Sequence, residues 1–155
     1  FDNSASNGVK ILSSAGSGTA ISITGTATGT TVGNNGQRGI FTGTGNLTIN
    51  ASGGGGITLT GTSVVANTTN PGGIYFGGSS DILASSGNIS IDGGTKGIYW
   101  TGTINLGALS AGAASGAVTI TGDLVPAATA AAPAFRTTRG SEVAAPAVTI
   151  GCSSF

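Results

Sequence analysis

The sequence predicts an all-β fold, a β-solenoid of about six coils with ~18–20 residues in each coil. The phrase apolar-x-apolar-Thr-Gly-Thr recurs along the chain, and its last apolar residue stands at positions 23, 41, 59, 76, 100 and 120. The first three steps between these positions are therefore 18, 18 and 17. Apolar and polar residues alternate within each copy, as the two-residue period of a β-strand requires. Glycines in and beside the copies permit the sharp corners that a solenoid needs.

The repeated phrase marks one strand of each predicted coil. It occupies residues 21–26, 39–44, 57–62, 74–79, 98–103 and 118–123. A second apolar series lies half a coil out of phase and predicts a second strand in each turn, at Leu12, Val32, Ile49, Val65, Leu83 and Leu109. The step from Phe76 to Trp100 is the longest in the first series and predicts one enlarged coil. We expect its extra residues around 85–92, as an additional strand or a protruding hairpin.

The repeat stops after Asp123, which divides the chain into a solenoid at 1–123 and an extended segment at 124–155. This segment is rich in alanine and proline, and its prolines exclude a continuous helix or a central strand. A final strand is predicted at 147–150, where it either returns to the solenoid or pairs with an adjacent subunit. The segment is therefore a candidate cap or subunit connector. Because the chain begins without Met, we expect a mature or excised piece.

The composition argues against most function classes. Of the 155 residues only 6 % are charged, none is His, one is Cys, and the formal net charge is zero. This composition predicts no nucleic-acid partner and no insertion into a membrane. Without His the chain has no nucleophile–histidine pair, and Asp does not recur in register as a calcium-binding solenoid requires. We therefore expect no metal, no cofactor and no enzyme activity.

A Ser–Lys pair would need Lys10 or Lys96 desolvated beside a serine. Paired carboxylates are the other catalytic arrangement left open, because β-helices also host polysaccharide-cleaving enzymes. The candidates within the coils are Asp81, Asp92 and Asp123. Asp81 and Asp92 belong to the predicted enlarged coil, in which their side chains would approach each other. The alternative interpretation is that these residues start a strand or occupy corners, where Asp is favoured. A polysaccharide-active enzyme is thus the most distant alternative function.

Threonines of the repeated phrase are predicted to line up along the rod. The candidate surface-binding row consists of Thr24, Thr26, Thr42, Thr44, Thr60, Thr62, Thr101 and Thr103. A flat grid of threonine methyls and hydroxyls is how β-solenoid ice-binding proteins engage ice, so ice binding is the first alternative function. Two points oppose it. The glycine between the threonines favours a bend, and threonine ladders also stabilise stacked strands by themselves.

Aromatic residues recur in equivalent strands of successive predicted coils. They are Phe41, Tyr75, Phe76, Tyr99 and Trp100. Side chains at equivalent positions of stacked strands lie within contact distance of one another. The sequence therefore predicts an aromatic ladder along the rod.

Four segments share a glycine followed by alternating apolar and Thr or Ser residues, at 45–53, 55–62, 87–93 and 116–122. These segments resemble the repeats of filamentous-haemagglutinin-like exoproteins, which two-partner systems secrete, and of autotransporter passengers. The resemblance covers roughly residues 8–123. It implies a right-handed parallel β-helix, export to the bacterial cell surface or beyond, and function as an adhesin, stiff stalk or filament. The implied partners are a host or neighbouring cell surface, with glycans among the candidates, and further copies joined end to end or through the C-terminal segment.

Overall fold

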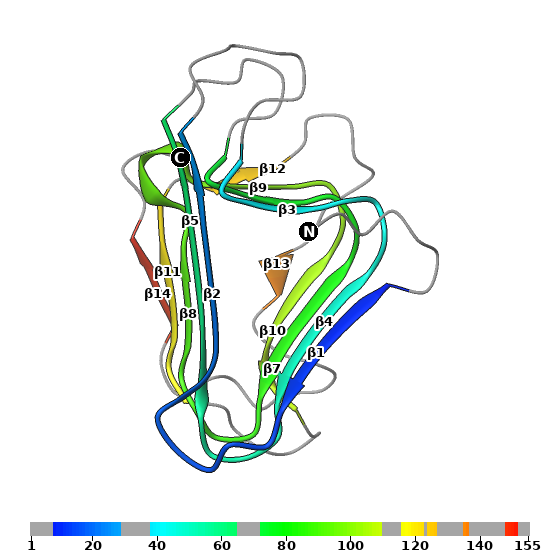
Figure 1. Cartoon of the computed structure of the whole chain (residues 1–155), viewed down its shortest axis with the longest axis vertical. Helices are drawn as coiled ribbons and strands as arrows, with labels where there is room; N and C mark the ends of the chain where they lie inside the picture. The colour runs from blue at the N-terminus through cyan, green and yellow to red at the C-terminus, as the bar shows by residue number, and fades with distance from the viewer. Residues whose placement is uncertain are drawn as a thin grey trace.

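The chain folds as a β-solenoid whose coils are built from three parallel sheets, as Figure 1 shows for the computed structural model. The structure describes residues 8–28, 38–64, 72–109 and 116–122, together with the backbone of short strands at 124–126, 135–136 and 148–151. Every strand pairing among these residues is parallel, and paired strands are three elements apart in the sequence. The predicted all-β solenoid is confirmed.

Each sheet takes one strand from every coil. Sheet A consists of β1 (Val9–Ser13), β4 (Leu47–Ala51), β7 (Ser80–Ala84), β10 (Ile104–Ala108) and β13 (Phe135–Arg136). Sheet B consists of β2 (Thr19–Ala27), β5 (Gly56–Ser63), β8 (Ile89–Asp92), β11 (Val118–Thr121) and β14 (Val148–Gly151). Sheet C consists of β3 (Ile40–Thr42), β6 (Ile74–Phe76), β9 (Ile98–Trp100) and β12 (Leu124–Pro126). One short 3-10 turn, η1 (Gly94–Lys96), connects β8 to β9.

The coils wind in a right-handed sense. In Figure 1 the chain runs up sheet B, across sheet C and down sheet A, and successive coils lie further from the viewer. A clockwise path that recedes from the viewer is right-handed. This is the hand that connections between parallel strands nearly always take, because twisted strands and their crossovers fit together only in that sense.

The strand register corrects the predicted length of a coil. In sheet B, Ile21 pairs with Ile57 and Ile57 pairs with Ile89, so the numbering advances by 36 and then by 32 from one coil to the next. In sheet C, Ile40 pairs with Ile74, an advance of 34. Successive early copies of the repeated phrase thus alternate between sheets B and C, so that the expected step spans only half a coil. The same phrase occurs in both sheets, because the strands of every sheet must point apolar side chains into the one bore.

The predictions of about six coils, of a short coil and of two strands per turn are therefore wrong. The described strands form four complete coils of three strands each, from β1–β3 to β10–β12, and β13 and β14 begin a fifth.

The predicted enlarged coil is also wrong. Residues 85–92 hold a short corner and β8, a regular member of sheet B. Phe76 pairs directly with Trp100, so the step between them is one whole coil and the shortest advance in sheet C. The two preceding coils are longer because their connections from sheet B to sheet C span 28–39 and 64–73, whereas the third coil uses only 93–97.

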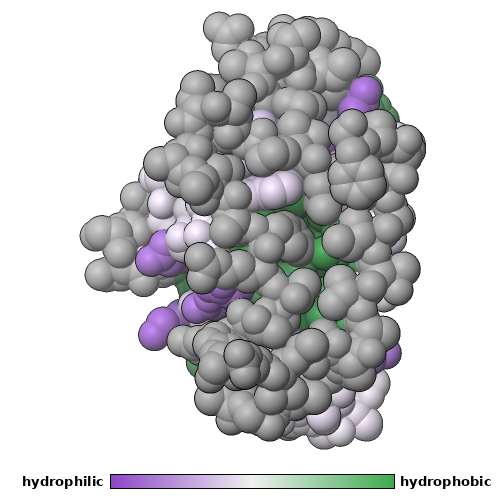
Figure 2. Space-filling view, turned by 180° about the vertical axis from the view of Figure 1, so that it is seen from behind, coloured by the Kyte–Doolittle hydropathy of each residue, from purple (hydrophilic) through white to green (hydrophobic). Residues whose placement is uncertain are grey.

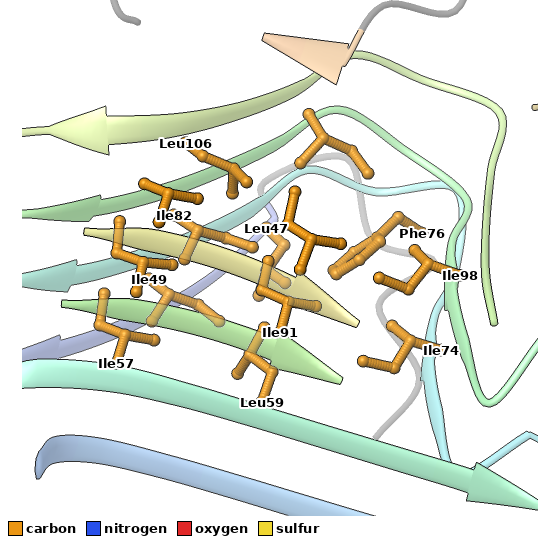
Figure 3. Packing of buried hydrophobic residues seen from close by; sticks show 14 of the residues in the cluster. Leu47, Ile49, Ile57, Leu59, Ile74, Phe76, Ile82, Ile91, Ile98 and Leu106 are labelled. Carbon is orange, nitrogen blue, oxygen red and sulfur yellow. The ribbon is translucent and has the colours of Figure 1, made fainter. Parts of the chain in front are cut away.

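Apolar side chains of the three sheets fill the bore. Figure 3 shows Phe76 pointing inward from β6 beside Ile74 and Ile98, toward the leucines and isoleucines of sheets A and B. Phe76 is 0 % exposed, and it is the largest of the fully buried side chains among the described residues. Figure 2 shows the opposite end of the molecule, where hydrophobic residues lie at the centre and hydrophilic ones toward the edges.

The first coil is less well covered than the second. Ile11 and Ile23 point into the bore but are only partly buried, whereas Ile49 and Leu59, their register partners in the second coil, are each 1 % exposed. A coil therefore needs a neighbour on both sides to bury its apolar face.

Some corners leave no room for a side chain. A Cβ atom added to Gly73 would lie 2.2 Å from the carbonyl oxygen of Gly61 and 2.2 Å from that of Gly93. Both obstacles are backbone atoms held by strand pairing or by a corner, so neither can move away easily. Gly16, at an exposed corner between sheets A and B, would meet nothing within 4 Å. Close approach of backbone to backbone thus explains why position 73 is a glycine, whereas position 16 has room for a side chain.

Strand pairing continues beyond residue 123, where we expected the solenoid to end. The strands β12, β13 and β14 extend sheets C, A and B respectively. The strand expected at 147–150 is β14, and it lies beside β11 within the solenoid. Pro126 lies in β12, an edge strand of sheet C, where a residue without an N–H is tolerated. The expected positions Val32, Val65 and Asp123 lie outside the described residues.

Candidate functional site

The predicted aromatic ladder is divided between two faces of sheet C. Phe41, Tyr75 and Tyr99 are register partners on the outer face, and their rings stack with centroid separations of 5.2 Å for each neighbouring pair. Phe76 and Trp100 are also register partners, but they lie in the bore. A single ladder of five rings is therefore wrong, because adjacent residues of a strand point to opposite faces.

A guanidinium group lies against the outer ladder. The Cζ atom of Arg38 is 4.9 Å from the ring centroid of Phe41 and 4.2 Å from that of Tyr75. These distances are within the range of a cation–π interaction. Because the two rings stack 5.2 Å apart, the guanidinium lies beside both of them rather than on the far face of Phe41.

The Arg38 guanidinium is partly buried and incompletely paired. Its Nε atom is buried without a hydrogen-bond partner, and among the described residues no carboxylate forms an ion pair with it. Burial lowers the pKa of Arg38, against an opposing effect of the Tyr75 and Tyr99 phenols. Burial also raises the pKa of Tyr99; Tyr75 adds to this rise and Arg38 opposes it. The outer face of sheet C thus combines aromatic side chains with a cation whose Nε–H has no hydrogen-bond partner.

Arg38 was not among the residues that the sequence pattern predicted for a site. The signal available was its position three residues before Phe41, in a chain that has only five Lys and Arg residues. That signal is weak, because a spacing of three residues does not by itself show that the Arg38 side chain turns toward the rings.

The predicted threonine row is also divided. Sheet B carries Thr24, Thr26, Thr60 and Thr62, while β3 and the connections from sheet C to sheet A carry Thr42, Thr44, Thr101 and Thr103. Thr42 is fully buried; its Oγ1 donates to the Tyr75 carbonyl at 3.4 Å and accepts from the Gly77 N–H at 3.2 Å. A single row along the rod is therefore wrong, because the repeated phrase belongs to two different sheets.

Sheet B nevertheless presents an ordered polar array on its outer face. One column along the solenoid is Ser22, Thr58, Ser90 and Thr119, and the next is Thr24, Thr60, Asp92 and Thr121. Thr26 and Thr62 begin a third column, in which the Thr62 hydroxyl donates to that of Thr26 at 3.2 Å. The strands β2 and β5 run through Thr-Gly-Thr without a break, so the expected bend at this glycine is absent from sheet B.

The two described candidate carboxylates lie on different walls. Asp81 is in β7 of sheet A, where its Oδ1 accepts from Asn105 Nδ2 at 2.7 Å. Asp92 ends β8 of sheet B, where its Oδ1 accepts from the Gly94 N–H at 2.8 Å. The expected approach of Asp81 to Asp92 is therefore wrong, since it depended on an enlarged coil that does not exist.

A polar groove runs along the corner between sheets A and B. Its volume is ≈ 490 Å³, and it crosses three coils. Glycines and the side chains of Thr19, Thr58, Ser86, Asn88 and Ser90 line most of it. Asn88 is already engaged, because its Oδ1 accepts from the Ala117 N–H at 2.9 Å. The groove offers neutral hydrogen-bonding groups and no ionisable side chain.

The described residues contain no group of three or more His, Cys, Asp and Glu side chains placed to hold a metal ion. None of their helices is long and apolar enough to span a bilayer.

Comparison of the chain with protein-family models, curated proteins and solved structures gives no match. The assignment of the solenoid fold therefore rests on the strand pairings described above. The resemblance to filamentous-haemagglutinin-like repeats stays a prediction.

Proposed function

We propose that this chain is a structural and adhesive rod of a secreted bacterial surface protein, acting as a stiff stalk or as a unit of a self-assembling extracellular filament. The observation that carries the proposal is the end of the solenoid formed by β1, β2 and β3. Among the described strands, each of these three has a partner on one side only. Unpaired strand edges are templates for further strands.

The apolar face of the same end favours association. Ile11 and Ile23 are partly exposed here, and a further coil would bury them as Ile49 and Leu59 are buried one coil later. Burying a side chain of this size stabilises by roughly 1.5–3 kcal/mol. A second copy or a preceding coil of a longer chain would supply the same surface. Each added coil lengthens the rod by about 4.8 Å, the spacing of paired strands.

The surface and composition support an extracellular role. The outer face of sheet B is rich in Ser and Thr, whose hydroxyls can form hydrogen bonds with a host or neighbouring cell surface. Low charge and a single Cys are compatible with export of an unfolded chain, as is the resemblance of its repeats to secreted adhesins.

Electron microscopy of the purified chain at rising concentration tests the proposal. We expect rods that associate end to end into fibres. The variant Ile11→Lys places a charge on the inner side of edge strand β1 and should raise the concentration needed for fibres by about tenfold or more, because a Lys at this edge opposes strand addition. Far-UV circular dichroism should show retained β-structure.

Ser14→Lys is the matched control, because Ser14 is exposed in the corner next to β1 and takes no place in the bore. It should leave association unchanged. Equal loss of fibres in both variants, or fibres that persist in Ile11→Lys, would contradict association through this end.

Ice binding is a second candidate function, favoured by the polar array of sheet B. Neighbours within one column are about 4.8 Å apart along the rod, and alternate residues of one strand are about 6.7 Å apart. Apart from the Asp92 carboxylate, the array is a regular grid of hydroxyls and methyls, and such a grid suits an ordered water lattice. The unbroken course of β2 and β5 removes the objection that Thr-Gly-Thr bends.

Thermal hysteresis measurements test this second function. Thr60→Lys places a long, bulky side chain in the middle of the array, which would prevent contact with a flat ice surface, and should abolish hysteresis. Thr48→Lys is the control, because Thr48 is on the outer face of sheet A, opposite Asp81 in the register. No hysteresis in the unmodified chain would refute ice binding and leave the adhesive rod unaffected.

A further inference from the structure

The outer face of sheet C presents an unusual combination of groups for a surface with so few charges. The Arg38 guanidinium lies beside the stacked rings of Phe41 and Tyr75. The rings attract the positive charge, but aromatic carbons are poor hydrogen-bond acceptors for its N–H donors. Its Nε–H is buried without a hydrogen-bond partner, and no described carboxylate pairs with the group.

A carboxylate complements this arrangement. Guanidinium donors form a planar fork that binds both oxygens of one carboxylate, and such charge-assisted hydrogen bonds are about twice as strong as neutral ones. A partly buried cation that pairs with no described carboxylate is costly, so a bound carboxylate would compensate its charge.

The neighbouring rings define what surrounds the carboxylate. Phe41 is the first ring of the ladder, in edge strand β3, so among the described rings only Tyr75 stacks on it. Because Arg38 lies beside the two rings, it does not cover the far face of Phe41, and no other described ring stacks there. An apolar ring face next to a phenol and a cation fits a sugar that has C–H groups on one face, hydroxyls at its edge and a carboxyl substituent.

We propose that Arg38, Phe41 and Tyr75 form a binding site for acidic polysaccharides, in which Arg38 holds the carboxylate of a uronic acid unit. The site lies on the outer face of sheet C, whereas the groove described above lies at the corner between sheets A and B. A site of only three side chains holds a single sugar weakly. A polymer overcomes this weakness, because many copies of the site along a filament engage one polysaccharide chain at once. The inference rests in this respect on the proposed function as an adhesive rod.

The test is binding of hexagalacturonate to the full chain, measured by isothermal titration calorimetry at low salt. We expect binding that weakens with added salt, because exposed charge interactions are screened. The fully methyl-esterified hexamer keeps the sugar rings and loses the charges, and it should bind at least about tenfold more weakly. This comparison uses the unmodified protein and does not depend on the folding of any variant.

Variants then locate the site. Arg38→Gln should lower affinity for hexagalacturonate by at least about tenfold, and Arg38→Lys should restore it only in part because an ammonium cannot bind both oxygens in a planar fork. Lys10→Gln is the control of equal charge, since Lys10 is exposed on sheet A. Ser86→Gln obstructs the groove and should have no effect.

Three results would overturn the proposal: no binding by the unmodified chain, equal binding of the methyl ester, or an equal loss in Lys10→Gln and Arg38→Gln. Loss of binding in Ser86→Gln alone would assign the ligand to the groove and would likewise refute the site at Arg38. Electron microscopy of the same samples separates the two proposals. Fibres without hexagalacturonate binding would leave the rod function standing, whereas binding by dispersed particles would support the site and contradict self-assembly.

Discussion

Replacing Phe76 by alanine is expected to destabilise the solenoid by about 3–5 kcal/mol, the range for removal of a buried aromatic side chain. Phe76 is fully buried; it lies beside Ile74 and Ile98 of sheet C and points toward the side chains of sheets A and B. The cavity cannot collapse easily along the rod, because strand pairing in every sheet fixes the spacing between coils. Urea unfolding followed by far-UV circular dichroism measures the change in the free energy of unfolding.

The neighbouring residue provides the control for Phe76. Tyr75 precedes it in β6 but lies on the outer face, where it stacks between Phe41 and Tyr99. Tyr75→Ala removes two ring contacts and leaves the bore filled, so a smaller loss of about 1–2 kcal/mol is expected. Equal losses at the two positions would show that the inner and outer faces of sheet C contribute alike, contrary to the burial described above.

Gly73→Ala is expected to have the second large effect, a loss of roughly 3 kcal/mol or more in the free energy of unfolding, because overpacking against fixed atoms forces the backbone to shift. The added Cβ would lie 2.2 Å from the carbonyl oxygens of Gly61 and Gly93. Relief requires the corner to move away from the neighbouring coil. That movement would weaken the hydrogen bond from the Gly73 N–H to the Gly97 carbonyl, which is 2.7 Å long.

The same substitution at Gly16 is the matched control. A Cβ at Gly16 meets nothing within 4 Å, so alanine should be neutral or should stabilise by up to about 1 kcal/mol through a less flexible unfolded chain. Thermal and urea unfolding of the two variants give the comparison. A Gly73→Ala protein as stable as the Gly16→Ala protein would refute the tight stacking of the corners.

The sequence was sufficient to predict parallel stacked strands but not the length of a coil. Alternation in segments such as 57–62 predicts which side chains enter the bore, and this prediction is confirmed by the burial of Ile57 and Leu59. Nothing in the repeated phrase distinguishes sheet B from sheet C, because both sheets require the same alternation of apolar and polar residues. Counting copies therefore gave half-coils until the short third coil, where the step from Phe76 to Trp100 spans a whole turn.

The surface groups were harder to predict than the bore. Tyr75 and Phe76 are adjacent, and the two-residue period alone already excludes one shared face for them. The position of Arg38 depends on the corner that precedes β3, and corners follow no periodic pattern. The outer array of sheet B was obscured for the same reason as the coil length, since half of the expected threonines belong to another wall.

The connections from sheet B to sheet C differ greatly in length, yet the strands that follow them keep their register. Residues 28–39 make this connection in the first coil and 93–97 make it in the third, while Ile40, Ile74 and Ile98 remain direct partners. The rise of one coil along the rod is thus independent of the number of residues in that coil. Insertions and deletions in this connection can therefore change its length without shifting the register of the strands in the three sheets.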